Sequence, residues 1–184
     1  MTAEVHSLRE PVTGDDWIRG AADAPVTLVE YADFECPDCQ ASHPALERVL
    51  DLYPGKIRFV FRHFPVVSRH PLAQGAALAA EAAGRQGSFW EMHERLFEAR
   101  GALASDDLRR YAQEIGLDLA RFEQDVLDPA LAAKIHEGKL LGVRSGVNGT
   151  PTIFLNGVRY DRPTPAIEEA HLRAAIEPLW GRGS

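Results

Sequence analysis

The chain contains two cysteines, Cys36 and Cys39, and only two residues separate them. The thiolate is the reactive form of cysteine, and a free thiol with a pKa near 8.5 is only about 3% ionised at neutral pH. Two cysteines at this spacing can form a disulfide with each other and exchange it with other thiols. The pair therefore predicts thiol–disulfide chemistry, in which one cysteine forms a mixed disulfide and the other resolves it.

The motif Cys36-Pro37-Asp38-Cys39 lies between a predicted strand and a predicted helix. Proline suits the first turn of a helix, where its missing N–H costs nothing. The unpaired backbone N–H groups at a helix N-terminus stabilise a thiolate placed there. We therefore expect Cys36 to be the exposed nucleophile with a lowered pKa, and Cys39 to be the more buried resolving thiol with a higher pKa.

Two other interpretations of the cysteine pair are open at this point. Structural zinc takes four ligands, but the chain has no second cysteine pair. His43 lies four residues after Cys39, yet the other histidines show no ligand spacing, so we expect no metal. The two cysteines could instead be inert core residues. A count of only two also argues against a disulfide-stabilised scaffold.

Hydrophobic patterning predicts a strand, a helix and a second strand, over residues 25–34, 37–53 and 56–64. A connection of this kind favours parallel pairing of the two strands. The remaining elements are predicted as a helical stretch, two short strands about an Asn-Gly turn and a last helix, over residues 71–145, 151–160 and 164–179. This order predicts an α/β core with an inserted helical region.

The length and charge of the chain narrow its function class. Its 184 residues fit one domain with a sizeable insertion, and 45% hydrophobic content is typical of a globular protein. The net charge of -7 disfavours binding to nucleic acid or to an anionic membrane surface. We expect no membrane insertion because no apolar run approaches 18 residues, and a cytoplasmic location because residues 1–20 lack an export-signal pattern.

Two segments, EYADFECPDC at residues 30–39 and GVNGTPTIFLNG at 146–157, resemble the thioredoxin-fold family. FRHFP at residues 61–65 also resembles sequences of this family. The helical insertion makes the chain more similar to DsbA-like thiol–disulfide oxidoreductases than to thioredoxin itself. The resemblance covers roughly residues 22–180 and implies a thioredoxin-like βαβ…ββα core in two parts around an all-helical subdomain: an N-terminal extension, core, insertion and core over residues 1–21, 22–65, 66–146 and 147–184.

The resemblance also implies a substrate-binding site. The family has a cis-proline opposite its active cysteines, and that position corresponds to Pro151, preceded by Thr150. In the family this loop offers backbone to an extended peptide, as in strand addition. Thr150, Pro151, Pro37 and Asp38 are therefore predicted to contact substrate.

Glu30 stands six residues before Cys36, where the family often has a buried acid. Its neighbours at a period of two, Leu28 and Ala32, are apolar, so its face of the strand is predicted to be interior. A buried carboxylate has a raised pKa and can relay the proton of Cys39. Arg62 is a candidate charge partner of Glu30, although a solvated surface arginine is the simpler interpretation.

Asp38 departs from DsbA itself, which resembles this motif but has histidine at that position. An imidazole there stabilises the thiolate, whereas an aspartate repels it. We therefore expect a weaker oxidant than DsbA, suited to disulfide reduction or isomerisation.

These features predict an enzyme of cell redox homeostasis, a protein disulfide oxidoreductase in which Cys36 is the nucleophile and Cys39 resolves. It needs no cofactor beyond this cysteine pair, and its partners are protein or peptide thiols and disulfides and a further redox protein. An alternative is a redox-sensing or regulatory module in which the same pair switches a partner. A glutathione-dependent transferase of the kappa type is disfavoured, because such proteins usually lack the second cysteine.

Overall fold

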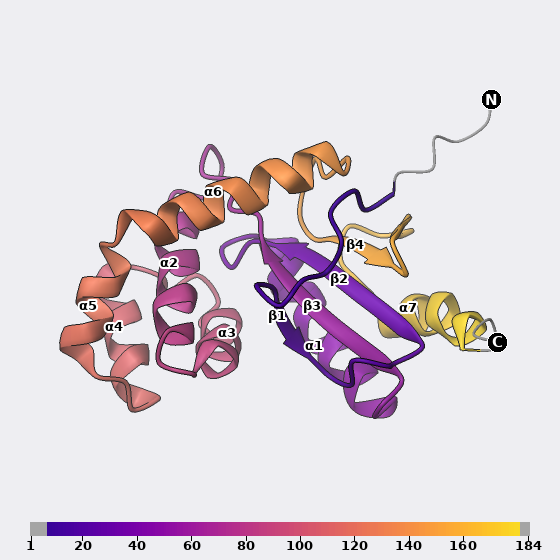
Figure 1. Ribbon diagram of the computed structural model, residues 1–184, viewed down its shortest axis with the longest axis horizontal. Helices are drawn as coiled ribbons and strands as arrows, with labels where there is room; N and C mark the ends of the chain where they lie inside the picture. The colour runs from indigo at the N-terminus through magenta and orange to yellow at the C-terminus, as the bar shows by residue number, and fades with distance from the viewer. Residues whose placement is uncertain (1–6, 181–184) are drawn as a thin grey trace.

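The computed structural model of the protein describes residues 7–180. The strands lie in the first and last parts of this range, and five consecutive helices separate the third strand from the fourth (Figure 1). In chain order the elements are β1 (Trp17–Arg19), β2 (Val26–Ala32), α1 (Pro37–Leu52), β3 (Ile57–His63), α2 (Ala73–Gly84), α3 (Phe89–Glu98), α4 (Ser105–Glu114), α5 (Leu119–Val126), α6 (Pro129–Arg144), β4 (Thr152–Leu155), β5 (Val158–Tyr160), α7 (Glu169–Ile176) and a 3₁₀ turn (Glu177–Leu179).

The strands form one mixed sheet in the order β1-β3-β2-β4-β5. Strands β2 and β3 are parallel, as the strand–helix–strand pattern predicted, and β4 lies antiparallel to β2. Strand β2 is central and buried on both faces, which explains its nearly continuous apolar sequence. The Asn-Gly turn predicted between β4 and β5 is confirmed: Asn156 and Gly157 have φ values of 48° and 81°.

Two apolar layers cover the sheet. On one face Leu28 and Ala32 belong to a core that also includes Cys39 and Leu46 of α1. On the other face Tyr31 belongs to a smaller cluster under the C-terminal part of α6. The thioredoxin-like α/β architecture expected from the sequence is thereby established.

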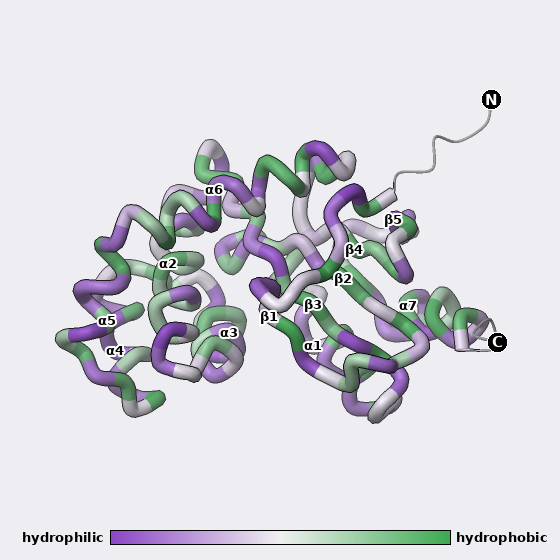
Figure 2. Tube along the Cα trace, viewed as in Figure 1, coloured by the Kyte–Doolittle hydropathy of each residue, from purple (hydrophilic) through white to green (hydrophobic). Residues whose placement is uncertain are grey.

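The helices α2 to α6 follow β3 and precede β4, so they interrupt the sheet-forming sequence (Figure 1). Helix α2 is rich in alanine and contacts α3, α4, α5 and α6, because small side chains let neighbouring helices approach closely. Helices α4 and α5 are coloured mainly hydrophilic in Figure 2, with short hydrophobic stretches. Within residues 7–180 no helix is both long and apolar enough to cross a membrane.

Two features differ from the expectations. Strand β1 lies in the segment assigned to an N-terminal extension, and it pairs antiparallel with β3. The last helix begins at Glu169 instead of residue 164. The backbone N–H of Ile167 donates to Ser42 Oγ at 2.8 Å, so the chain is fixed to α1 before that helix starts.

Candidate active site

The two cysteines lie at the start of α1. Cys36 is the N-cap residue, with φ −67° and ψ 122°, and Pro37 occupies the first turn. The backbone N–H of Cys36 donates to the carbonyl of Asp33 at 3.1 Å, which fixes the turn between β2 and the helix. Both cysteines are free thiols. Cys36 is 6% exposed and Cys39 is 1% exposed, so Cys39 is the more buried, but the expectation of an exposed Cys36 is wrong.

The two thiols have opposite pKa shifts. The hydrogen bond from Cys39 has the largest effect on Cys36; burial opposes it, and the Thr150 side chain and the backbone N–H groups of Asp38 and Cys39 add to the lowering. The resulting pKa of Cys36 is about 6. Burial, and then the hydrogen bond to Cys36, raise the pKa of Cys39 well above its usual value. At neutral pH, Cys36 is therefore mostly a thiolate and Cys39 a thiol.

The carboxylate of Asp38 is not among the strongest influences on the pKa of Cys36. Asp38 is half-buried and contributes its backbone: the N–H points to Cys36 and the carbonyl accepts Ser42 Oγ at 2.5 Å. The repulsion expected from the sequence is thus weaker than the hydrogen bonds around the sulfur. Pro37 is exposed beside it.

The loop before β4 lies against Cys36. The carbonyl of Thr150 accepts Cys36 Sγ at 3.4 Å across 114 residues of sequence, and the Thr150–Pro151 peptide bond is cis. Strand β4 follows this loop directly. Its first residue, Thr152, pairs with Tyr31 near the end of β2, and the cysteine motif follows β2 in the chain. Thr150 and Pro151 are therefore brought to the cysteines by sheet pairing.

Glu30 lies near the middle of β2 and is 2% exposed, so its interior position is confirmed. Burial raises its pKa to about 7, although the charges of His43 and Arg162 oppose this and that of Glu47 adds to it. A carboxyl with this pKa can both accept and return a proton near neutral pH.

The proposed pairing of Glu30 with Arg62 is wrong, and Arg62 is not a solvated surface residue either. Arg62 Nε donates to Asp16 Oδ1 at 2.7 Å, and Arg62 Nη1 donates to Tyr31 Oη at 2.9 Å. The contact with Tyr31 belongs to the opposite face of β2 from Glu30. The segment before β1 supplies the partner, which periodicity within β3 does not reveal.

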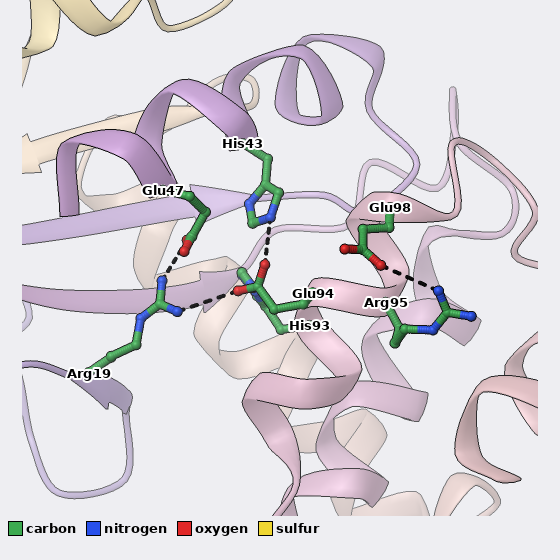
Figure 3. A network of polar contacts seen from close by, with 7 residues as sticks. All are labelled: Arg19, His43, Glu47, His93, Glu94, Arg95 and Glu98. Atoms are coloured by element: carbon green, nitrogen blue, oxygen red, sulfur yellow. Dashed lines mark hydrogen bonds and ion pairs between the residues drawn. The ribbon is translucent and has the colours of Figure 1, made fainter. Parts of the chain in front are cut away.

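A polar network that the sequence analysis missed lies beside α1 (Figure 3). His43 Nε2 is 2.8 Å from Glu94 Oε2, Arg19 Nη1 is 3.4 Å from Glu94 Oε1, and Arg19 Nη2 is 2.5 Å from Glu47 Oε1. The available signal was the spacing of four residues between Cys39 and His43, which places both on one face of a helix.

His43, His93 and Glu94 are the one group of described residues arranged so that three side chains could hold a metal ion. Their potential ligand atoms lie within 4.8 Å of one another, a grouping that the spacing of the histidines in the sequence did not indicate. Arg19 already contacts Glu94, and its positive charge disfavours a divalent cation there. The Glu94 carboxylate instead pairs with Arg19 and His43.

Asp33 joins the cysteine loop to the segment after β3. Its carboxylate accepts the backbone N–H of Glu35 and of Val66, each at 2.8 Å, and lies 2.7 Å from His70 Nδ1. A buried carboxylate with three partners holds its surroundings firmly. These contacts of Asp33 were not expected from the sequence, because no neighbouring residue in the chain indicates that Val66 and His70 are its partners.

A family model described as thioredoxin matches residues 12–177 of the chain. The chain belongs to the thioredoxin family. A thioredoxin-like oxidoreductase from Silicibacter pomeroyi is 27% identical, with a TM-score of 0.80 over 93% of this chain and 95% of that one. Alpha-DsbA1 of Wolbachia pipientis has the same fold at 22% identity, with a TM-score of 0.80 over 93% and 94% of the two chains. The DsbA-like form of the thioredoxin fold is thereby shown.

The curated relatives that the chain matches are much longer than it is. The chain is 44% identical over 182 residues to Na(+)/H(+) antiporter NhaA 3 of Salinispora tropica, covering 95% of this chain and 28% of that protein. It is 48% identical over 154 residues to Na(+)/H(+) antiporter NhaA 1 of Salinispora arenicola, covering 83% and 24%. The chain thus spans about a quarter of the length of these relatives.

Proposed function

We propose that the protein is a thiol–disulfide oxidoreductase that acts on protein disulfides through Cys36 and Cys39. The observation that supports this most is the contrast between the two thiols: Cys36 at the helix N-terminus has a pKa of about 6, and buried Cys39 has a raised pKa. An attacking thiol with a pKa near ambient pH combines thiolate content with nucleophilicity.

The proposed reaction uses the chain's own side chains and no further cofactor. The Cys36 thiolate attacks a substrate disulfide and forms a mixed disulfide, and the first substrate thiolate leaves. Cys39 gives its proton to Glu30, and its thiolate attacks Cys36 Sγ. The Cys36–Cys39 disulfide forms as the second substrate thiolate leaves, and an external dithiol protein then reduces it.

Substrate is proposed to bind along the motif and the loop opposite it. The exposed Pro37, half-buried Asp38 and the backbone at Thr150 and Pro151 surround Cys36, so an extended peptide placed there brings its disulfide to the sulfur.

Single-cysteine variants test this function. Cys36→Ser should abolish reduction of insulin, whereas Cys39→Ser should still attack and should accumulate mixed disulfides, visible on non-reducing gels. Each variant is the control for the other, since both remove one thiol. Faster alkylation of Cys39 than of Cys36 at pH 6 in the wild-type protein would reverse the assignment.

The direction of catalysis is proposed from the pKa of Cys36. The value of about 6 lies between about 7 for thioredoxin and about 3.5 for DsbA. We therefore expect a reduction potential between about −270 and −120 mV, to be measured by equilibration with glutathione. A potential in the lower part of this range, near that of thioredoxin, suits reduction in the cytoplasm, and one near that of protein disulfide isomerase suits isomerisation. A value at or above the upper bound would instead indicate disulfide donation.

A second candidate function is a redox-regulatory module whose cysteine pair switches a partner domain. The observation that favours it is the 44% identity to a segment of a protein named as an antiporter. The two functions differ in turnover. With dithiothreitol as the reductant, an enzyme raises the rate of insulin reduction far above that of dithiothreitol alone, whereas a regulatory module leaves that rate unchanged.

A further inference from the structure

Polar side chains form a stripe along the inner face of α1. Cys39, His43 and Glu47 lie at positions i, i+4 and i+8, so they occupy successive turns of one face. Cys39 and His43 are buried, and the Glu47 side chain is 24% exposed. Glu30 of β2 faces the same core layer as Cys39. A line of titratable groups therefore leads from the resolving thiol towards the surface.

His43 is held firmly within this stripe. Its ring stacks on Phe97 with centroids 4.6 Å apart and an angle of 17°, and Nε2 is 2.8 Å from Glu94 Oε2 (Figure 3). Burial lowers the pKa of His43, but the hydrogen bond and charge of Glu94, together with the charges of Glu47 and Glu30, raise it above its usual value. This ion pair favours the protonated form of His43 and holds its ring at a fixed, partly buried position.

The other charges near His43 and Glu30 come from several elements. Burial lowers the pKa of the neighbouring His93 to about 4, so that ring is neutral. Within residues 7–180 the titratable and charged groups around the pair are Cys39 and Glu47 of α1, His93 and Glu94 of α3, Arg19 of β1 and Arg162 of the segment before α7. Arg19 is held by Glu47 and Glu94, which leaves His43 as the cation in the stripe itself.

We propose that His43, held in place by Glu94, supplies the positive charge that lets Glu30 accept the proton of Cys39. In this proposal His43 acts through Glu30, so it is a positioning residue. The proposal rests on the proposed function and adds to it the residue that determines how the rate of the resolving step depends on pH.

The reaction of reduced protein with 5,5′-dithiobis(2-nitrobenzoate) isolates that step. The Cys36 thiolate attacks the reagent, forms a mixed disulfide and releases one nitrothiobenzoate. Cys39 then passes its proton to Glu30 and attacks Cys36 Sγ, which releases a second nitrothiobenzoate and forms the internal disulfide. Stopped-flow absorbance separates the two releases, and the rate of the second is measured from pH 5 to 9.

In the wild-type protein the second rate should rise with pH around a midpoint near 7, the pKa of Glu30. In His43→Gln the midpoint should move up by about one pH unit, since a positive charge that lowers the pKa of Glu30 is lost. The rate below the midpoint should then fall by about tenfold. Glu94→Gln should move the midpoint in the same direction, because His43 then loses the partner that keeps it protonated.

Glu47→Gln is the matched control on the same face of α1, because it removes a charge of opposite sign and should lower the midpoint. His43→Lys, which restores the charge, should return the midpoint towards its wild-type value. An unchanged midpoint in both His43→Gln and Glu94→Gln, with both releases still observed, would overturn the role of His43 and leave the oxidoreductase function standing. Absence of the first release would overturn both.

Discussion

At the scale of single residues, the two cysteines differ because different atoms surround each sulfur. Cys36 receives hydrogen bonds from the Cys39 thiol, the Thr150 side chain and two backbone N–H groups, which stabilise its thiolate. Cys39 lies beneath it, where burial and the charge of Glu30 disfavour ionisation. Two identical side chains, one helical turn apart, thus have opposite pKa shifts.

Glu30 should make the stability of the protein depend on pH. Its pKa is about 7 in the folded chain against 4.5 ordinarily, so the folded state holds the extra proton between these values. The contribution of Glu30 to the unfolding free energy is fully present below pH 4.5 and is lost as the pH rises through 7. The difference in unfolding free energy between Glu30→Gln and the wild type should therefore increase by about 3 kcal/mol, in favour of the variant, from pH 4 to pH 8. Urea unfolding at the two pH values measures it.

Glu30→Gln should also slow the second nitrothiobenzoate release, because Cys39 loses its proposed proton acceptor. Glu98→Gln changes an acid that is 63% exposed, and its unfolding free energy should follow the wild type at both pH values. A parallel pH dependence in Glu30→Gln and the wild type would show that Glu30 is not the responsible group.

Asp38 offers a second residue-scale test. Asp38→His should lower the pKa of Cys36 by about half a unit, because it exchanges a carboxylate for a positive or neutral ring at a half-buried position. The reduction potential should rise by roughly 15 mV, since thirty millivolts correspond to about 1.4 kcal/mol. Thiolate absorbance against pH and equilibration with glutathione measure the two quantities. If neither changes, the side chain at this position does not act on Cys36.

At the scale of elements, α6 is positioned by a close approach to the sheet. A Cβ placed on Gly142 would lie 2.7 Å from Tyr31 Cε1 and 3.2 Å from Phe64 Cδ2. The Tyr31 ring cannot move easily, because its hydroxyl is bound to Arg62 at 2.9 Å. Glycine is therefore required where this helix crosses the β2 side chains.

Gly142→Ala should lower the unfolding free energy by about 1–3 kcal/mol, as overpacking does in other cores. Gly138→Ala is the matched control one turn earlier on α6, where a Cβ meets no atom within 4 Å. That variant should be more stable than the wild type by about 0.5–1 kcal/mol, because alanine favours the helix. Chemical unfolding measures both, and equal effects would contradict the proposed contact.

At the scale of the whole molecule, redox state and stability should be coupled. The pKa of Cys36 falls from 9.0 to about 6 in the folded reduced chain, so thiolate stabilisation is present above pH 9 and is lost as pH falls through 6. The oxidised chain has no thiolate there. From pH 6 to 8.5 the unfolding free energy of the reduced form should therefore rise relative to the oxidised form by roughly 3 kcal/mol.

Urea unfolding of both redox forms at several pH values measures this difference. Because Glu30 titrates in both forms, most of its contribution cancels in the comparison. The double variant Cys36→Ser/Cys39→Ser has no redox form to change and should show no dependence on oxidant. A difference between the two redox forms that does not vary with pH would rule out thiolate stabilisation at Cys36.

Features that depend on neighbouring residues could be predicted from the amino-acid sequence. Alternation around Glu30 indicated its buried face, and the proline after Cys36 indicated the start of α1. The Asn156-Gly157 turn was predicted from the backbone conformation that these residues tolerate. Local patterns were sufficient here because the physical causes, side-chain periodicity and backbone sterics, act over a few residues.

The contacts between residues far apart in the sequence depend on the tertiary structure. Arg62 binds Asp16, 46 residues away, and His43 binds Glu94, 51 residues away. Thr150 reaches Cys36 because β4 pairs with β2, and Ile167 is fixed by Ser42 before the last helix begins. Such pairings depend on sheet order and helix docking, and buried polar atoms accept whichever partner the packing brings within reach.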